Sequence, residues 1–154
     1  MIAHMNKNLK HLYQIAQKPE RLILGLMSGT SLDGLDMALC KVSGAGLQTE
    51  VELLKFYTYP YSSPQRHRLQ EVVSQAEVSL QNLTILHAWL GDLHARFILE
   101  TLEKWEVLPQ EIDLLASHGQ TVYHAPKSIH HLLTLPNATL QLGDGDHLAV
   151  KTGI

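Results

Sequence analysis

The sequence has little of several things, and each shortage excludes a class of protein. Cys40 is the single cysteine among 154 residues, so no disulfide can form within the chain, as expected for a reducing compartment. The longest apolar run, at 22–27, is far shorter than the roughly 20 residues that a membrane-spanning helix needs. Lys and Arg number 12 against 15 Asp and Glu, so no positive excess favours nucleic acid or an anionic membrane as a partner.

What remains is an ordinary globular composition. Hydrophobic residues make up 45% and charged residues 18% of the chain, which excludes a disordered or low-complexity protein. The segment up to Pro19 has no continuous apolar core, so it is not a secretory signal. Its apolar residues recur at helical spacing. We therefore expect residues 1–20 to form a helical extension of a single domain at 21–154.

Apolar patterning predicts an α/β chain with a mixed sheet that opens as a three-stranded antiparallel meander. The predicted strands lie at 21–27, 35–42, 51–59, 112–116 and 139–142, and the predicted helices at 63–76, 79–105 and 146–151. Leu35, Met37 and Leu39 alternate toward one face of the second strand. Ile154 reads as the start of a further strand, so we expect an incomplete sheet and the N-terminal part of a longer protein.

A polar, glycine-bearing turn between the first two strands is the strongest candidate site. It reads Ser28-Gly29-Thr30-Ser31-Leu32-Asp33-Gly34-Leu35-Asp36. Glycines permit a ligand to approach the backbone, and successive backbone N–H groups bind anions. Asp33 or Asp36 would hold Mg²⁺ through water. The turn lacks the lysine of a Walker A loop and leads into a strand. A plain hairpin is the alternative reading.

Two further polar blocks follow the later strands. The second is Ser117-His118-Gly119-Gln120-Thr121-Val122-Tyr123-His124-Ala125-Pro126, and the third is Thr139-Leu140-Gln141-Leu142-Gly143-Asp144-Gly145 with Thr152-Gly153-Ile154 after it. His118 stands at the carboxyl end of a predicted strand, where α/β sheets bind ligands. From the residues alone, a histidine hydrogen-bonded within a loop is the alternative.

In this order, the three blocks resemble the signatures of the anhydro-N-acetylmuramic acid kinase family. The resemblance implies an RNase H-like fold of the superfamily of sugar kinases, actin and heat-shock chaperone ATPases. Residues 21–154 would be most of its first domain, and the second domain is absent. It implies a cytoplasmic enzyme of cell-wall recycling, with ATP and Mg²⁺, a small amino sugar as substrate, and a family that often forms dimers. The product would be N-acetylmuramic acid 6-phosphate, formed as water opens the anhydro ring.

The same resemblance implies roles for individual residues. The ATP phosphates would be embraced by Ser28, Gly29, Thr30, Ser31, Leu32, Asp33, Gly34 and Leu35, and the sugar would be contacted by His118 and Gln120. The general base would be the aspartate of an Asp-x-Gly-Pro-Gly-Asn stretch, which residues 1–154 do not contain. We therefore expect no catalytic residue in this chain and no turnover by it alone. Members of the wider superfamily usually carry an aspartate just before the turn, where this chain has Leu26-Met27-Ser28.

Three other readings stay open. The 10 histidines invite a metal site, but no pair has the His-x-x-x-His spacing of a helical zinc site. His87 and His94, seven residues apart, are read as solvated or packing side chains. The chain could instead be a non-catalytic phosphate- or nucleotide-binding module that pairs through a sheet edge. A hydrolase with Asp33 and Asp36 as a carboxylate pair is weaker, because strand residues three apart point to opposite faces.

Overall fold

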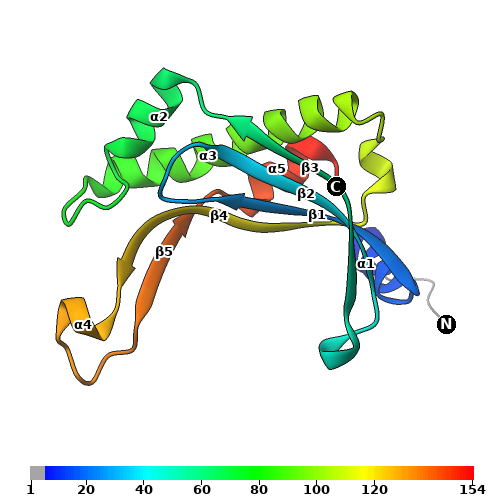
Figure 1. Ribbon diagram of the computed structural model, residues 1–154, viewed down its shortest axis with the longest axis horizontal. Helices are drawn as coiled ribbons and strands as arrows, with labels where there is room; N and C mark the ends of the chain where they lie inside the picture. Colours follow the sequence, from blue (N-terminus) through cyan, green and yellow to red (C-terminus); the bar gives the residue numbers. More distant parts are fainter. Residues whose placement is uncertain (1–5) are drawn as a thin grey trace.

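The computed structural model describes residues 6–154 and shows an α/β chain built on one five-stranded sheet (Figure 1). The strands are β1 (Glu20–Ser28), β2 (Gly34–Ser43), β3 (Glu50–Pro60), β4 (Leu114–Ala125) and β5 (Ala138–Leu142). The helices are α1 (Lys7–Ala16), α2 (Ser63–Gln70), α3 (Leu80–Lys104), α4 (Lys127–His130) and α5 (Gly145–Thr152). Helix α1 is the helical part of the expected extension, and residues 1–5 lie outside the described residues.

The sheet is mixed, and its order is β3-β2-β1-β4-β5. Strands β1, β2 and β3 pair antiparallel, which confirms the predicted meander. Strand β4 lies parallel to β1, whereas β5 returns antiparallel to β4. A parallel pair needs a long crossover connection, and here α2 and α3 supply it between β3 and β4.

Helix α3 covers one face of the sheet (Figure 1). Its apolar stripe is buried at Leu86, Leu90, Leu93 and Phe97, while Leu83 is half-buried. The facing strand β2 buries the alternate residues Leu35, Met37 and Leu39. These two patterns, of period 3.6 and period 2, meet in one hydrophobic core.

Helix α5 packs against α3 at Gly91. A Cβ at Gly91 would lie 2.7 Å from the carbonyl oxygen of Asp144 and 2.9 Å from the Cβ of His147. Only glycine allows the two helices to approach this closely. Gly153 ends α5 in the left-handed conformation with φ 75°, which is typical of a glycine that follows a helix.

The predicted helix at 63–76 is too long, because α2 ends at Gln70. Val72 and Val73 still donate their N–H groups to the carbonyl of Leu69. Ser74 then takes a left-handed φ of 61° and donates to the carbonyl of Val122, 2.8 Å away. This contact with β4 pulls the chain out of the helical path.

The predicted strand at 112–116 is wrong in its extent, because β4 runs from Leu114 to Ala125. Gly119 bends the strand with a φ of 74°. Up to Gln120 β4 pairs with β1, and from Gln120 onward it pairs with β5, so Gln120 has a partner on both sides. The second block, expected as a loop, therefore lies almost entirely within a strand that changes partner at a glycine.

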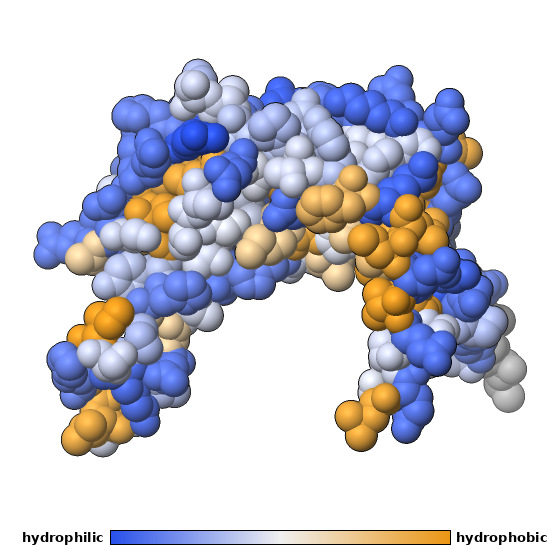
Figure 2. Space-filling view, in the orientation of Figure 1, coloured by the Kyte–Doolittle hydropathy of each residue, from blue (hydrophilic) through white to orange (hydrophobic). Residues whose placement is uncertain are grey.

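Two segments project from the body of the molecule on the same side (Figure 2). One, which we call the arm, comprises residues 121–140 with α4 at its end, and the other is the tip of the β2–β3 hairpin. Exposed apolar side chains gather at both ends, among them Leu133 on the arm and Leu47 on the hairpin. Among the described helices, none has the length and apolar character required to cross a membrane.

Candidate functional site

The turn after β1 is closed by its own backbone and anchored by one buried side chain. The N–H of Leu32 donates to the carbonyl of Gly29 over 3.2 Å. Leu32 adopts a left-handed φ of 57°, and its side chain is buried in the core. Leucine rarely adopts this conformation, which costs roughly 1 kcal/mol. Burial of the side chain offsets that cost and fixes the loop.

The carbonyl groups of this turn are held toward the protein. The amide Nε2 of Gln120 donates to Gly29 O over 2.8 Å. The N–H of Tyr61 donates to Asp33 O over 3.1 Å. Thr30 and Ser31, between these two tethered carbonyls, are exposed, and their N–H groups donate to no backbone carbonyl within residues 6–154. The turn thus offers backbone and hydroxyl donors to solvent, as an anion site requires.

Beneath the turn lies a buried chain of polar side chains, which we call the relay: Ser28, Tyr61, His94 and Gln120. Ser28 Oγ is 2.6 Å from Gln120 Oε1 and 2.8 Å from Tyr61 Oη. Tyr61 Oη is in turn 2.7 Å from His94 Nε2. Ser28, His94 and Gln120 are 0% exposed and Tyr61 4%. Two of these side chains, Tyr61 and Gln120, thus meet at the Ser28 hydroxyl, and His94 of α3 is joined to it through Tyr61.

Burial keeps the relay uncharged. Removal from water lowers the pKa of His94 to about 3, because the imidazolium form would lose its hydration. Burial likewise raises the pKa of the Tyr61 phenol, against a smaller opposing effect of its hydrogen bond with Ser28. At neutral pH the relay therefore consists of a neutral imidazole, a phenol, an alcohol and an amide. Nδ1 of His94 has no hydrogen-bond partner in the described part of the chain.

The two predicted sugar ligands are placed differently. His118 is exposed in β4, and Nδ1 makes only a long 3.4 Å contact with the carbonyl of Gly119. Gln120 is buried, and its amide accepts from Ser28 and donates to the carbonyls of Gly29 and Thr121. Of the two side chains, only His118 presents polar atoms to a ligand.

The two aspartates suggested for Mg²⁺ also differ. Asp33 is exposed on the turn. Asp36 is half-buried in β2, and its Oδ1 accepts from Thr58 Oγ1 over 2.6 Å. Within residues 6–154 no group of three or more His, Cys, Asp or Glu side chains is arranged to hold a metal ion. Mg²⁺ bound to a nucleotide needs only one or two protein carboxylates, so Asp33, next to the outward donors, fits it better than Asp36.

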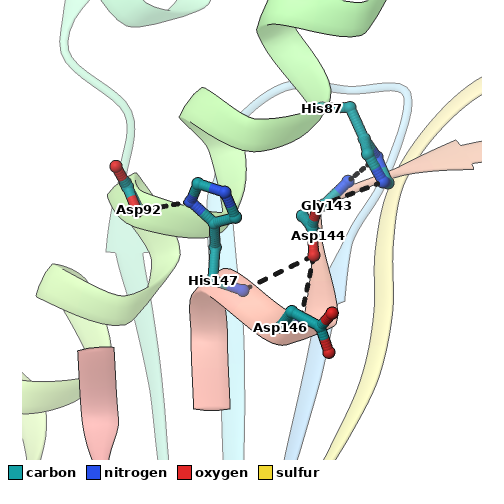
Figure 3. A network of polar contacts seen from close by, with 6 residues as sticks. All are labelled: His87, Asp92, Gly143, Asp144, Asp146 and His147. Atoms are coloured by element: carbon teal, nitrogen blue, oxygen red, sulfur yellow. Dashed lines mark hydrogen bonds and ion pairs between the residues drawn. The ribbon is translucent and has the colours of Figure 1, made fainter. Parts of the chain in front are cut away.

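The third block ties α5 to α3 (Figure 3). Asp144 caps α5 by accepting from the N–H of Asp146 over 2.9 Å, and Gly143 donates to His87 Nδ1 over 3.1 Å. On the other side, His147 Nδ1 lies 2.9 Å from Asp92 and lowers the pKa of that carboxyl group. His87 and His94 therefore have separate roles despite sharing a face of α3, since one holds the third block and the other supports the turn.

Sequence reasoning missed Tyr61 and His94. Neither belongs to a polar block, and His94 sits inside an otherwise apolar stripe of α3. That position was the only available signal, because a histidine among core leucines needs a polar partner. The partner itself, 33 residues away in sequence, could not be read from spacing.

The structure is that of an α/β chain with a mixed sheet, whose first turn exposes Thr30 and Ser31 above a buried polar support. Comparison with known proteins makes this specific: the profile of the family described as anhydro-N-acetylmuramic acid kinase matches residues 21–154. The chain belongs to this family, and the family is one of kinases.

Relatives from distant bacteria carry the same description. An anhydro-N-acetylmuramic acid kinase of Pseudoalteromonas translucida is 50% identical over 150 residues, which cover 97% of this chain and 37% of the relative. One of Caldanaerobacter subterraneus is 40% identical over 146 residues, or 95% of this chain and 37% of the relative. The chain thus spans little more than a third of the length of these relatives. Among solved structures, CasPhi-2 (Cas12j) bound to crRNA gives a TM-score of 0.24 at 10% identity over 67% of this chain and 18% of that one, which is too low to bear on the fold.

Proposed function

We propose that residues 21–154 form the phosphate-binding wall of an ATP-dependent anhydro-N-acetylmuramic acid kinase. The observation that carries the proposal is the turn at 28–35, whose carbonyls are tethered inward while Thr30 and Ser31 face solvent. Phosphoryl transfer depends mainly on positioning and on stabilisation of charge, and outward N–H and O–H donors supply both.

The reaction we propose consumes 1,6-anhydro-N-acetylmuramic acid, water and ATP, and yields N-acetylmuramic acid 6-phosphate and ADP. The hydroxyl of water adds at C1 as the anhydro bond breaks, and O6 takes the γ-phosphoryl group. Thr30 and Ser31 would orient the phosphates, His118 would hydrogen-bond the sugar, and Asp33 would hold Mg²⁺ through water. The bound Mg²⁺ would neutralise phosphate charge. A role in peptidoglycan recycling and a cytoplasmic location remain predictions.

The fold supports a place in the superfamily of sugar kinases, actin and chaperone ATPases. The antiparallel meander, the helical crossover and the parallel β4 in the order β3-β2-β1-β4 suit an RNase H-like domain. No Asp-x-Gly-Pro-Gly-Asn stretch occurs in residues 1–154, so the base that would activate water is not supplied by this chain. We therefore propose that the chain turns over only together with a second domain that carries it.

A hybrid kinase tests the proposal. In it, this chain replaces the matching part of the Pseudoalteromonas translucida relative, and phosphorylation of the anhydro sugar is measured with both substrates varied. We expect an active hybrid and no turnover by residues 1–154 alone. His118→Ala should raise KM for the sugar about 10-fold, which corresponds to the loss of one hydrogen bond, with KM for ATP unchanged. An inactive hybrid would contradict the proposed kinase function. A rise in KM for ATP alone in His118→Ala would contradict the role of His118 at the sugar.

A reading of the gene beyond the codon for Ile154 complements the hybrid. An open frame that encodes Asp-x-Gly-Pro-Gly-Asn would supply the proposed base. A stop codon would favour a binding role over catalysis.

The second candidate is a binding module that pairs through the edge of the sheet. Strand β3 is an edge strand, and Val51, Leu53 and Phe56 are exposed on it. Such an edge can pair with a second copy. Sedimentation velocity of residues 1–154 would show a dimer if this holds, and Leu53→Lys should return it to a monomer. A monomer at all concentrations would exclude this candidate.

A further inference from the structure

The family resemblance implies no role for the relay beneath the turn, and it places Gln120 at the sugar. We propose that Gln120 is instead a positioning residue for ATP, which holds the Gly29 carbonyl inward so that the donors of Thr30 and Ser31 face the phosphates. This inference rests on the proposed function of the turn. It joins the second block of the sequence to the first.

The orientation of the Gln120 amide follows from its partners. Its two N–H bonds go to the carbonyls of Gly29 and Thr121, over 2.8 and 2.9 Å. A carbonyl oxygen only accepts, so Nε2 must face these two groups and Oε1 must face Ser28. A turned amide would place Oε1 against two carbonyl oxygens. The donation from Ser28 to Oε1 supports this orientation and so stabilises the tether on Gly29.

The hydroxyl proton of Ser28 has two acceptors within reach. Gln120 Oε1 lies at 2.6 Å and Gly34 O at 3.1 Å, and the shorter contact takes the proton. Tyr61 can then donate to Ser28 Oγ, while Nε2–H of His94 donates to Tyr61 Oη. The hydrogen bonds run in one direction from α3 to the turn. His94 Nδ1, which has no partner within residues 6–154, then carries a lone pair and no hydrogen.

The hydrogen bond from Gln120 to Gly29 acts on the part of the turn that we assign to the phosphates. Gly29 directly precedes Thr30 and Ser31, and the inward tether fixes the peptide plane between Gly29 and Thr30. The N–H of Thr30 belongs to that plane and points opposite to the Gly29 carbonyl. Release of the carbonyl would let the plane rotate and turn this donor away from the ligand. His118, two residues before Gln120 and exposed, remains on the sugar side.

The test compares Gln120→Met, which keeps the length of the side chain but loses its hydrogen bonds, with His118→Ala in the hybrid kinase. We expect Gln120→Met to raise KM for ATP and lower kcat/KM for ATP about 10- to 100-fold, as a misaligned reacting group does. KM for the sugar should stay unchanged. A purely structural role would lower the melting temperature without separating the two substrates, and that result would overturn the inference.

Ser28→Ala provides a second variant that removes a single oxygen, and it decides the matter if Gln120→Met does not fold. Ser28→Ala should also raise KM for ATP and leave KM for the sugar unchanged. The double variant should lose no more kcat/KM for ATP than Gln120→Met alone, because both residues act through the tether on the Gly29 carbonyl. Additive effects would contradict this. Thr30→Ala separates the two proposals. If Thr30→Ala leaves ATP kinetics unchanged, the phosphate turn itself is wrong. If Thr30→Ala impairs ATP use while Gln120→Met impairs only the sugar, this inference alone fails.

Discussion

The two turns of the meander begin with the same dipeptide but have opposite support. Ser28-Gly29 lies over the relay, whereas Ser43-Gly44 opens the β2–β3 hairpin, whose tip residue Leu47 is fully exposed. Ser28 is buried and hydrogen-bonded to three residues. In the second turn the side-chain hydrogen bonds are exposed: Thr49 Oγ1 donates to the carbonyl of Gly46, and Arg21 Nη1 makes a long 3.5 Å contact with the carbonyl of Gly44. What distinguishes the candidate site from an ordinary polar glycine turn is the set of buried, hydrogen-bonded side chains beneath it.

The largest expected effect concerns two glycines, Gly34 after the first turn and Gly46 in the second. Gly44 does not separate the turns, because a Cβ there would lie 2.1 Å from the carbonyl oxygen of Gln48. A Cβ on Gly34 would lie 2.1 Å from the carbonyl oxygen of Tyr59, whereas one on Gly46 would meet no atom within 4 Å. Gly34→Ala should lower the free energy of unfolding by about 4 kcal/mol or prevent soluble expression. Gly46→Ala, with φ 57°, should cost about 1 kcal/mol. Thermal unfolding of the hybrid measures both, and equal losses would break the comparison.

The next largest effect concerns ATP use. Thr30→Ala or Ser31→Ala should lower kcat/KM for ATP by the equivalent of about 1–3 kcal/mol, as loss of a preorganised donor does. Thr49→Ala removes a threonine hydroxyl from the second turn and should leave the kinetics unchanged. Initial rates at varied ATP supply the comparison. Equal behaviour of the three variants would remove the functional distinction between the turns.

Acid should weaken the support of the first turn. Burial lowers the pKa of His94 to about 3, against about 6.5 in an unfolded chain. Between these pH values the unfolded chain binds a proton at His94 and the folded chain does not. The contribution of His94 to the free energy of unfolding is therefore complete above pH 6.5 and is lost as pH falls. The slope is about 1.4 kcal/mol per pH unit. His94→Gln should flatten the fall in melting temperature between pH 6.5 and 4.5, and an unchanged profile would show that His94 is not the group involved.

The smallest expected effect is a difference in the free energy of unfolding between two buried hydroxyl groups, those of Ser28 and Thr101. Thr101 Oγ1 is buried and makes no hydrogen bond within residues 6–154, unlike Ser28 Oγ. Thr101→Val replaces it with a methyl group of similar size and should raise the free energy of unfolding by about 0.5 kcal/mol. Ser28→Ala should lower it by about 2 kcal/mol. Calorimetry of both variants tests the contrast, and a destabilised Thr101→Val would point to a partner of this hydroxyl.

Local patterns in the sequence predicted much of the fold. The alternation in β2 predicted its buried residues Leu35, Met37 and Leu39, because the strand presents one face to the core. The polar run around Gly119 resembled a loop, although the strand continues through it with a change of partner. The end of α2 depends on Ser74 reaching Val122, a contact that no window of neighbouring residues contains.

The sequence likewise predicted one part of the candidate site, the turn, but not the relay beneath it. The turn at 28–35 was identified from its glycines and hydroxyls, which are adjacent in the sequence. The relay was not, because Tyr61 and His94 reach Ser28 only after the sheet and α3 have packed together. Spacing likewise could not separate His118 from Gln120, since the bend at Gly119 decides which of them is buried.

The span of the relay also sets an order of events during protein synthesis. Ser28 and Gln120 are 92 residues apart, and a ribosome that adds roughly 5 to 20 residues per second needs about 5 to 20 seconds to pass from one to the other. Throughout that interval Ser28 can donate to the carbonyl of Gly34 but not to Gln120. The turn at 28–35 is thus among the first segments to be made, whereas the hydrogen bonds from Gln120 that support it require β4.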